Sequence, residues 1–250
     1  MTSLLAVDDV TQRFGRLVAV NRVSMLVDPG ELRAVIGPNG AGKTTFFNLV
    51  SGMLLPTGGR IYFEGEDVTL LPVHQRVRRG IARTFQITEI FPELTVSENL
   101  RVGLEVAAGH RLSVWASRRA EARIRAARDD LLELGRLTAK RDRLVGELSH
   151  GDQRSTEIMM ALALDPRLLL LDEPTAGMSD HETFEIAVLI QRLHRQRGLT
   201  MILIEHDMRV IFHLADRITV MAEGAVLAEG KPQEIARDDR VQEAYLGDPR

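Results

Sequence analysis

The chain has 250 residues, 44% of them hydrophobic, which is enough for one large domain, or for a domain with a second one inserted, around a buried core. It has no cysteine, which excludes disulfides, thiolate zinc sites and cysteine nucleophiles and fits a reducing compartment such as the cytoplasm. The formal net charge of -3 provides no overall positive field, so we expect no nucleic-acid partner.

No segment of the sequence predicts passage through a membrane. The N-terminus lacks the basic start and the long apolar stretch of a signal peptide. The longest aliphatic runs, 168–171 and 201–204, are far shorter than the about 20 residues that cross a bilayer. We therefore expect any membrane role to come through a partner.

The first part of the chain predicts short strands and hairpins. Residues 4–10, 23–27 and 59–63 alternate or cluster apolar side chains between turn formers. Another apolar run, 32–36, leads into a glycine-rich loop, after which residues 43–50 have the pattern of a helix. This pattern predicts a small β region that contains a strand–loop–helix unit.

From about Thr95 to Leu164 the pattern becomes helical. One helix is predicted to open near Ser97, and others cover 117–134 and 153–164, where apolar residues recur at helical spacing among charges. This stretch is predicted to contain helices only.

The last part of the chain alternates strands and helices again. Strands are predicted at 168–171 and 200–204 with a helix at 183–195 between them, and a hairpin over 218–227 precedes a helical tail that reaches Tyr245. Such alternation implies an α/β fold with a mostly parallel sheet.

The glycine-rich loop matches the pattern GxxxxGK[ST]. In this pattern glycines let backbone N–H groups approach phosphate oxygens, the lysine neutralises β- and γ-phosphate charge, and the threonine hydroxyl holds Mg²⁺. The alternative is a glycine-rich turn that only caps a helix. The predicted nucleotide-binding residues are Gly37, Pro38, Asn39, Gly40, Ala41, Gly42, Lys43, Thr44 and Thr45.

Two carboxylates, Asp172 and Glu173, end the apolar run at 168–171. Open α/β sheets place their ligand sites at such strand ends. We expect Asp172 to hold Mg²⁺, directly or through water, and Glu173 to polarise the water that attacks the γ-phosphate. Taken alone, an acidic pair after a strand is more often a helix cap than a catalytic site, but together with the phosphate loop it favours catalysis.

Three further residues are weaker candidates. His206 follows the apolar strand 200–204 and could donate a hydrogen bond to the γ-phosphate, or simply mark a strand end. Gln86 precedes the helical region and could touch water or Mg²⁺, or be a solvated loop amide. Phe14 could stack on adenine or pack inward.

Together these residues resemble the nucleotide-binding domains of ABC transporters, from Phe14 to Gly230. The resemblance implies a P-loop NTPase (RecA-like) core with a mostly parallel sheet, an N-terminal antiparallel β subdomain and an inserted α-helical subdomain. On this basis residues 1–250 are one nucleotide-binding domain, with 1–86 and 165–250 as the catalytic core with its β subdomain and 87–164 as the helical subdomain.

The resemblance also implies ligands and roles. ATP and Mg²⁺ are bound, and hydrolysis makes the chain an Mg-dependent ATPase. The roles implied are an adenine-stacking aromatic at Phe14, phosphate and catalytic contacts at Lys43, Mg²⁺ contacts at Thr44, Gln86 and Asp172, a catalytic carboxylate at Glu173, and a γ-phosphate switch at His206.

The LSGGQ signature of that family is altered here, because residues 148–152 read Leu-Ser-His-Gly-Asp. The Ser149 hydroxyl and the Gly151 N–H remain suited to the γ-phosphate of ATP held by a second protomer. We expect Asp152 to turn away from phosphate and to cap the following helix. Ser179 stands where an aspartate is usual.

Shorter strings, among them Arg-Thr-Phe-Gln at 83–86 and Glu-Ala-Tyr-Leu-Gly at 243–247, resemble the ATP-binding subunits of branched-chain amino acid and urea or amide importers. That resemblance implies transmembrane permease subunits, contacted near residues 89–94, and a second ATP-binding subunit, either a copy or a paralogue. It also implies a periplasmic or extracellular substrate-binding protein acting indirectly, and a cytoplasmic position on the inner face of the plasma membrane.

Three other ABC proteins remain alternatives. One is a soluble ATPase of the iron–sulfur assembly type, which has this size. A DNA-repair ATPase is disfavoured, because the chain lacks a long coiled-coil or zinc-binding insertion. A non-catalytic regulatory nucleotide-binding module is disfavoured by the presence of Lys43, Asp172, Glu173 and His206.

Overall fold

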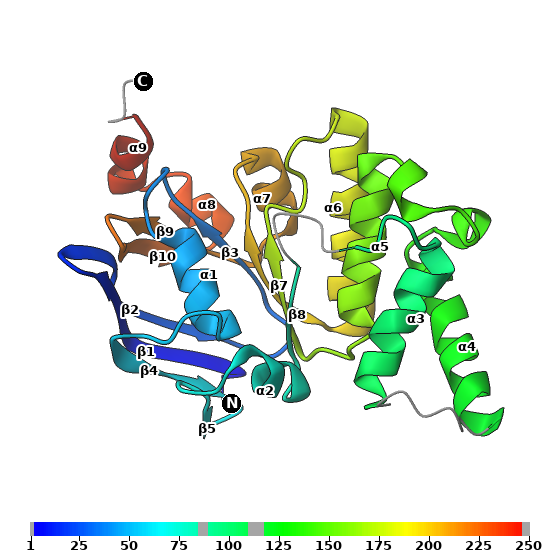
Figure 1. The fold of residues 1–250 in the computed structure, drawn as a ribbon. Coiled ribbons are helices and arrows are strands. Elements are labelled where there is room, and N and C mark those ends of the chain that lie inside the picture. Colours follow the sequence, from blue (N-terminus) through cyan, green and yellow to red (C-terminus); the bar gives the residue numbers. More distant parts are fainter. Residues whose placement is uncertain (1–2, 85–89, 110–117, 247–250) are drawn as a thin grey trace.

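A six-stranded sheet forms the centre of the protein in a computed structural model, which describes residues 3–84, 90–109 and 118–246 (Figure 1). The strand order is β10-β9-β3-β8-β7-β6, and all neighbours are parallel except the β9–β10 hairpin. The prediction of a mostly parallel sheet is confirmed. The strands are β3 (Leu32–Ile36), β6 (Ile81–Arg83), β7 (Leu168–Asp172), β8 (Thr200–Ile204), β9 (Arg217–Ala222) and β10 (Ala225–Gly230).

A second, antiparallel sheet has the order β2-β1-β4-β5. Its strands are β1 (Leu5–Phe14), β2 (Leu17–Val27), β4 (Gly58–Phe63) and β5 (Glu66–Asp67). β1 and β2 are longer than the sequence pattern predicts, because register shifts along their pairing interrupt the alternation of buried and exposed residues.

Helix α1 (Lys43–Ser51) lies between the two sheets. Its Phe46, Phe47, Leu49 and Val50 are buried in one cluster with residues from both sheets. The helix ends at Gly52, whose φ of 82° is left-handed. The strand β3 and the apolar face of α1 are therefore buried, which fixes both ends of the partly exposed loop between them.

The buried guanidinium of Arg76, from α2 (Val73–Arg78), closes the C-terminus of α1. It donates hydrogen bonds of 2.6 and 2.7 Å to the carbonyls of Leu49 and Val50 in the last turn of the helix. A cation here also complements the negative end of the helix dipole.

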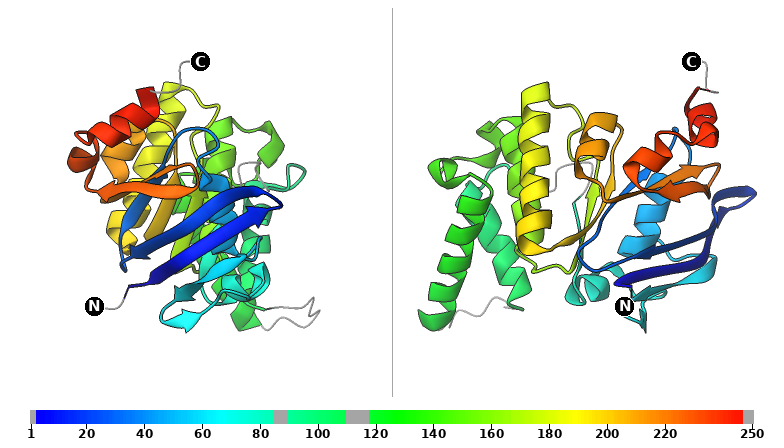
Figure 2. Two further views of the ribbon diagram at one scale, coloured as in Figure 1. Left: turned by 90° about the vertical axis from the view of Figure 1, so that its left-hand side faces the viewer. Right: turned by 180° about the vertical axis from the view of Figure 1, so that it is seen from behind.

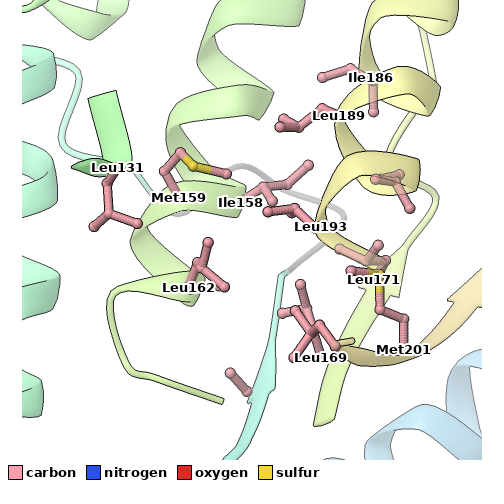
Figure 3. Packing of buried hydrophobic residues seen from close by; sticks show 14 of the residues in the cluster. Leu131, Ile158, Met159, Leu162, Leu169, Leu171, Ile186, Leu189, Leu193 and Met201 are labelled. Atoms are coloured by element: carbon pink, nitrogen blue, oxygen red, sulfur yellow. The ribbon is translucent and has the colours of Figure 1, made fainter. Parts of the chain in front are cut away.

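Helices α5 (His150–Leu162) and α6 (Asp180–Arg197) cover the other face of the central sheet. Helices α3 (Val96–Ala107) and α4 (Arg118–Leu134) pack on the side of α5, farther from the sheet (Figure 1). Figure 3 shows Ile158 and Leu162 of α5 and Leu189 and Leu193 of α6 packed toward the sheet residues Leu169, Leu171 and Met201. Alternate residues of β7, Leu168 and Leu170, face α1 instead, as the two-residue period of a strand requires.

The helical subdomain and the antiparallel sheet lie at opposite ends of the molecule (Figures 1 and 2). Between α4 and α5 the chain forms two short 3₁₀ turns, at Thr138–Lys140 and Val145–Glu147. The chain continues through α7 (Met208–Leu214), α8 (Pro232–Ile235) and α9 (Asp239–Leu246). Of the helices within the described ranges, none is long and apolar enough to cross a bilayer.

Candidate active site

The loop before α1 has a backbone that only glycine tolerates at two positions. Gly37 has a φ of 151°, and a Cβ there would lie 2.1 Å from the carbonyl oxygen of Met221. Gly42 has a φ of 94°, and its Cβ would lie 2.3 Å from the carbonyl oxygen of Ala19. The glycines of the motif thus hold the loop close to the neighbouring chain.

The first turn of α1 directs backbone donors out of the protein. Among the described residues, no protein acceptor contacts the N–H groups of Lys43, Thr44 and Thr45. Their partial positive charge adds to that of the helix N-terminus, which is the arrangement that binds anions.

The side chain of Lys43 lies back on the loop. Its ammonium donates hydrogen bonds to the carbonyl oxygens of Gly37 at 2.7 Å and Pro38 at 3.0 Å. Burial lowers the pKa of Lys43, while the negative charges of Glu173 and Asp172 raise it. Burial has the larger effect, so the pKa of Lys43 lies below its ordinary value.

A cavity of about 520 Å³ lies over the loop. Predicted residues that line it include Asn39, Gly40, Thr44, Glu173 and His206, and the lining is completed by Leu17, Val18, Ala19, Ala41, Gly42, Lys43, Thr45, Glu223 and Gly224. The structure therefore brings together the predicted phosphate loop and two of the predicted catalytic residues.

Phe14 lies at the end of β1, opposite Leu17, and is 47% exposed. Leu17, Val18 and Ala19, which follow in the same hairpin, line the cavity, but Phe14 does not. Its stacking on adenine stays a prediction. Gln86, together with Glu89 of the expected permease contact, lies outside the described residues.

The two carboxylates after β7 have different surroundings. Asp172 is only 2% exposed, and its Oδ2 accepts a hydrogen bond of 2.7 Å from the Arg83 guanidinium. Glu173 faces the cavity, and its φ of 45° is left-handed. This conformation is costly for a residue other than glycine, and such strain gathers at functional sites.

His206, at the exit of β8, contacts Glu173. Its Nε2 lies 2.7 Å from Oε1 of the carboxylate, and 48% of the imidazole side chain is exposed. Two residues 33 positions apart in sequence therefore meet over the phosphate loop. A carboxylate paired with an imidazole at a cavity wall can accept and hold a proton.

Glu205, which the sequence marks only as part of a strand end, connects the chain segments that follow β7 and β8. The side chain is buried, and its Oε1 accepts hydrogen bonds from the N–H and the hydroxyl of Thr175 at 2.9 and 2.5 Å. Its Oε2 accepts one from the N–H of His206 at 2.8 Å. Glu205 thereby fixes the turn after Glu173 relative to His206.

Arg154 of α5 is a further supporting residue that the sequence does not indicate, because no pattern near it in the chain predicts its partners. Its guanidinium donates to the carbonyl oxygens of Asp172 at 3.2 Å, Glu173 at 2.8 Å and Pro174 at 3.1 Å. Nη1 pairs with Glu157 at 2.7 Å, and both side chains are buried. The helical subdomain thus holds the backbone that carries the two carboxylates.

The altered signature begins α5. Ser149 is the N-cap, because its hydroxyl accepts a hydrogen bond from the Asp152 N–H, so the predicted start at residue 153 and the predicted cap at Asp152 are wrong. The Asp152 carboxylate instead contacts the Lys140 ammonium at 2.5 Å. The N–H of Gly151 donates to Oε1 of Glu182 at 3.1 Å. Ser149 and Gly151 are not among the residues that line the cavity over the phosphate loop.

Comparison with protein families gives two matches. The model described as "ABC transporter" matches residues 20–176, and the model described as "Branched-chain amino acid ATP-binding cassette transporter" matches residues 225–250. The first covers more than half of the chain.

Relatives of known function match almost the whole length. The high-affinity branched-chain amino acid transport ATP-binding protein BraF of Pseudomonas aeruginosa is 40% identical over 255 residues, and LivG of Salmonella typhimurium, with the same description, is 41% identical over 250. The lipopolysaccharide export system ATP-binding protein LptB of Haemophilus influenzae is 36% identical over 246 residues. Each match covers 98% of both chains.

Solved structures agree with the fold. The ADP conformation of MJ1267, an ATP-binding cassette of an ABC transporter, has a TM-score of 0.87 and 32% identity, covering 99% of this chain and 100% of that one. A dimeric post-hydrolysis state of the ATP-binding cassette MJ0796, bound to ADP and Pi, has a TM-score of 0.77 and 25% identity, covering 91% and 98%. The phosphate loop and the contact between Glu173 and His206 agree with these matches. The matches show that the chain belongs to the ABC transporter family, as one of its ATP-binding subunits.

Proposed function

We propose that this protein hydrolyses ATP to energise a membrane importer of branched-chain amino acids or related amino acids or amides. The observation that carries the hydrolytic part is the 2.7 Å contact of Glu173 with His206 beside the phosphate loop. The substrate class rests on BraF and LivG, which resemble this chain at 40% and 41% identity over 98% of its length.

The phosphate loop, Glu173 and His206 have distinct tasks in this proposal. The N–H groups of the first turn of α1 and the Lys43 ammonium bind the β- and γ-phosphates. Glu173 accepts a proton from the attacking water, in line with the γ-phosphate. His206 orients the Glu173 carboxylate through Nε2, and the same N–H donates to the γ-phosphate instead once ATP is bound. Gln86 as a contact to water or Mg²⁺ is part of the proposal.

The residues present fit Mg²⁺. This ion is usually held by one or two carboxylates together with substrate phosphates and water, and Thr44 and Asp172 offer a hydroxyl and a carboxylate. Consistently, the described residues contain no group of three or more His, Cys, Asp or Glu able to hold a metal by themselves. Bound there, Mg²⁺ neutralises charge on the phosphate oxygens.

The position of the altered signature, residues 148–152, supports a dimer. Because Ser149 and Gly151 are not part of the cavity over the phosphate loop, they can meet a γ-phosphate only if a second subunit presents them. We propose a head-to-tail pair, formed with a second copy or with a paralogue. The MJ0796 dimer is a precedent in a similar fold.

A groove of about 250 Å³ is the proposed contact with a permease. Its walls come from α2 and β6 of the core and from α3 and α5 of the helical subdomain, and its lining is mostly apolar, including Met53, Val77, Val106 and Met160. Met53 and Val106 are 49% and 62% exposed. An apolar helix face of a membrane subunit is the occupant that suits such a groove, and the described part of this chain has no membrane-spanning helix of its own.

The remaining parts of the proposal follow from that assembly. The catalytic core with its β subdomain comprises 1–86 and 165–250, and the helical subdomain comprises 87–164. The protein works at the cytoplasmic face of the membrane, without a nucleic-acid partner, and a periplasmic or extracellular substrate-binding protein acts on it only through the permease. These assignments rest on the resemblance to importer subunits.

Phosphate release by purified Glu173→Gln tests the hydrolytic part. We expect ATP to bind while turnover falls by about 10² to 10⁴-fold, because the variant cannot accept the proton of water. Glu243→Gln, an exposed carboxylate on α9, is the matched control and should retain activity. Substantial turnover by Glu173→Gln would remove Glu173 from the role of base, and no turnover by the unaltered protein would favour a regulatory module.

Co-purification tests the transport part. Permease subunits should be recovered with the tagged protein, and reconstituted vesicles should take up branched-chain amino acids only when ATP is supplied. An active ATPase with which no permease subunit co-purifies would instead favour the iron–sulfur assembly type.

A further inference from the structure

Arg83 connects three parts of the molecule that the proposed function uses separately. It ends β6, directly opposite Leu170 of β7, and therefore lies beside Asp172, two residues further along the same strand face. Only 7% of its side chain is exposed. The guanidinium contacts Asp172, helix α1 and the lining of the groove.

The contact with Asp172 is well defined. Nη2 of Arg83 lies 2.7 Å from Oδ2 of the carboxylate, and both side chains are almost fully buried. A charge-assisted hydrogen bond of this length in a buried place fixes the rotamer of its acceptor.

A second set of contacts ties the same guanidinium to α1. Nη1 donates to Oδ1 of Asn48 at 2.6 Å and to the hydroxyl of Ser51 at 3.2 Å, and the guanidinium carbon lies 5.6 Å from the centre of the Phe47 ring. Two of the three predicted Mg²⁺ ligands, Thr44 and Asp172, belong to α1 and β7. Arg83 is therefore bonded to both elements that carry them.

The third contact is with the groove. Arg83 is one of its lining residues, and Nη1 lies 3.5 Å from the sulfur of Met53, another of them. Met53 follows α1 and is 49% exposed. An occupant of the groove would therefore meet Met53 and the guanidinium that holds Asp172.

We propose that Arg83 is a positioning residue that braces Asp172 against α1 for Mg²⁺ and makes this brace sensitive to an occupant of the groove. The inference rests on the proposed function, because it concerns the metal carboxylate and the permease groove of that assembly. Partners one step behind a metal ligand orient it, and their loss typically lowers metal affinity by about 10 to 100-fold.

The first experiment measures metal affinity without turnover. The purified full-length chain is loaded with ADP, and its affinity for Mg²⁺ is determined by calorimetry; ADP binding is measured separately in EDTA. For Arg83→Gln we expect a loss of Mg²⁺ affinity of about tenfold or more with ADP binding in EDTA unchanged. Arg79→Gln, which removes the exposed partner of Glu66, should change neither.

Lysine at the same position separates charge from geometry. Arg83→Lys keeps a cation but has no planar fork to reach Asp172 and Asn48 together, so we expect only partial recovery. Unchanged or tighter Mg²⁺ affinity in Arg83→Gln, or full recovery in Arg83→Lys, would contradict the proposal that the Arg83 guanidinium positions Asp172. If ADP does not bind in EDTA to any variant or to the unaltered chain, the proposed function fails instead.

The second experiment tests the groove. Because the chain has no cysteine, a single Met53→Cys can be labelled with a bulky maleimide that stands in for an occupant. We expect the label to lower Mg²⁺ affinity by about twofold or more, and to have no effect when Arg83→Gln is also present. The same label on Leu26→Cys, 60% exposed on β2, should have no effect. An equal effect of the label at Met53→Cys with and without Arg83 would overturn the coupling.

Discussion

Two helix N-termini of this protein are suited to phosphate, and they differ in whether their first-turn N–H groups already donate hydrogen bonds within the protein. In α1 the N–H groups of Lys43, Thr44 and Thr45 contact no acceptor among the described residues, and the first turn has no acid. In α5 the N–H groups of Gly151 and Asp152 already donate, to Glu182 and Ser149, and the turn contains an acid. The first site is therefore preorganised, whereas the second must exchange contacts before it can bind.

This difference assigns an order to the proposed cycle. A nucleotide can bind at α1 in a single subunit, because the backbone N–H groups there have no acceptor to give up among the described residues, and only the Lys43 ammonium has to leave the carbonyl oxygens of Gly37 and Pro38. At α5 a γ-phosphate has to replace the Glu182 carboxylate at the Gly151 N–H, so binding there depends on the closing of a second subunit. The signature residues therefore contribute to γ-phosphate binding only when the two subunits close on each other.

Among the variants that test this comparison, Lys43→Ala has the largest expected effect, and Ser149→Ala is compared with it. Hydrogen bonds to charged groups contribute about 1.5–3 kcal/mol, so Lys43→Ala should weaken ADP binding to the monomer by about 10 to 100-fold. Ser149→Ala should leave monomer binding unchanged and reduce only the ATP-dependent dimer. Fluorescent ADP titration and analytical ultracentrifugation measure the two quantities. Equal loss of monomer binding in both variants would contradict the comparison.

The sequence predicts the α1 site better than the α5 site for a physical reason. The phosphate loop is a local pattern, in which glycines at fixed spacing dictate the backbone, and the apolar runs 168–171 and 200–204 predict buried strands directly. The partners of the α5 site are non-local, since Gly151 and Glu182 are 31 residues apart in the chain. Nothing near Gly151 in the sequence indicates which carboxylate reaches it.

The same limit applies to the side chains that support the carboxylates. Arg83 and Asp172 are 89 residues apart, and Thr175 and Glu205 are 30 apart. These pairs meet because β6, β7 and β8 are neighbours in the sheet, and strand order is a property of the whole fold. The sequence predicts a parallel sheet but not the order of its strands.

A smaller effect is expected at Lys140, which neutralises the acid of the altered signature. Lys140→Met keeps the apolar stem but leaves the Asp152 carboxylate uncompensated near the incoming phosphate. In a Glu173→Gln background we expect the ATP-dependent dimer to weaken by about twofold to fivefold. Dimer affinity from ultracentrifugation is the measurement.

Restoring charge balance provides the control for Lys140. Asp152→Asn combined with Lys140→Met should recover dimer affinity, because no acid then remains without its cation. A dimer that is equally weak in the double variant would show that Lys140 acts through something other than Asp152.

Glu182→Gln should act in the opposite direction. A neutral amide is a weaker acceptor for the Gly151 N–H and removes a negative charge near the γ-phosphate, so the ATP-dependent dimer should tighten by about twofold in the Glu173→Gln background. Glu185→Gln, an exposed acid on the same helix, is the matched control. A weaker dimer for Glu182→Gln would mean that the carboxylate assists closure rather than competing with it.

The smallest expected effect is on stability and its pH dependence. The hydroxyl of Ser179, followed by the N–H groups of Gly151 and Ser179, holds the pKa of Glu182 below its ordinary value of 4.5. Since the folded pKa is lowered, the stabilisation is complete above 4.5 and is lost as pH falls through the folded pKa. The Tm difference between the unaltered protein and Glu182→Gln should be constant near neutrality and close in acid. In a Ser179→Ala background the Tm difference should be small at every pH, because the largest cause of the lowered Glu182 pKa is removed. An undiminished Tm difference would mean that the N–H of Gly151, at the start of α5, is the main cause of the lowered pKa.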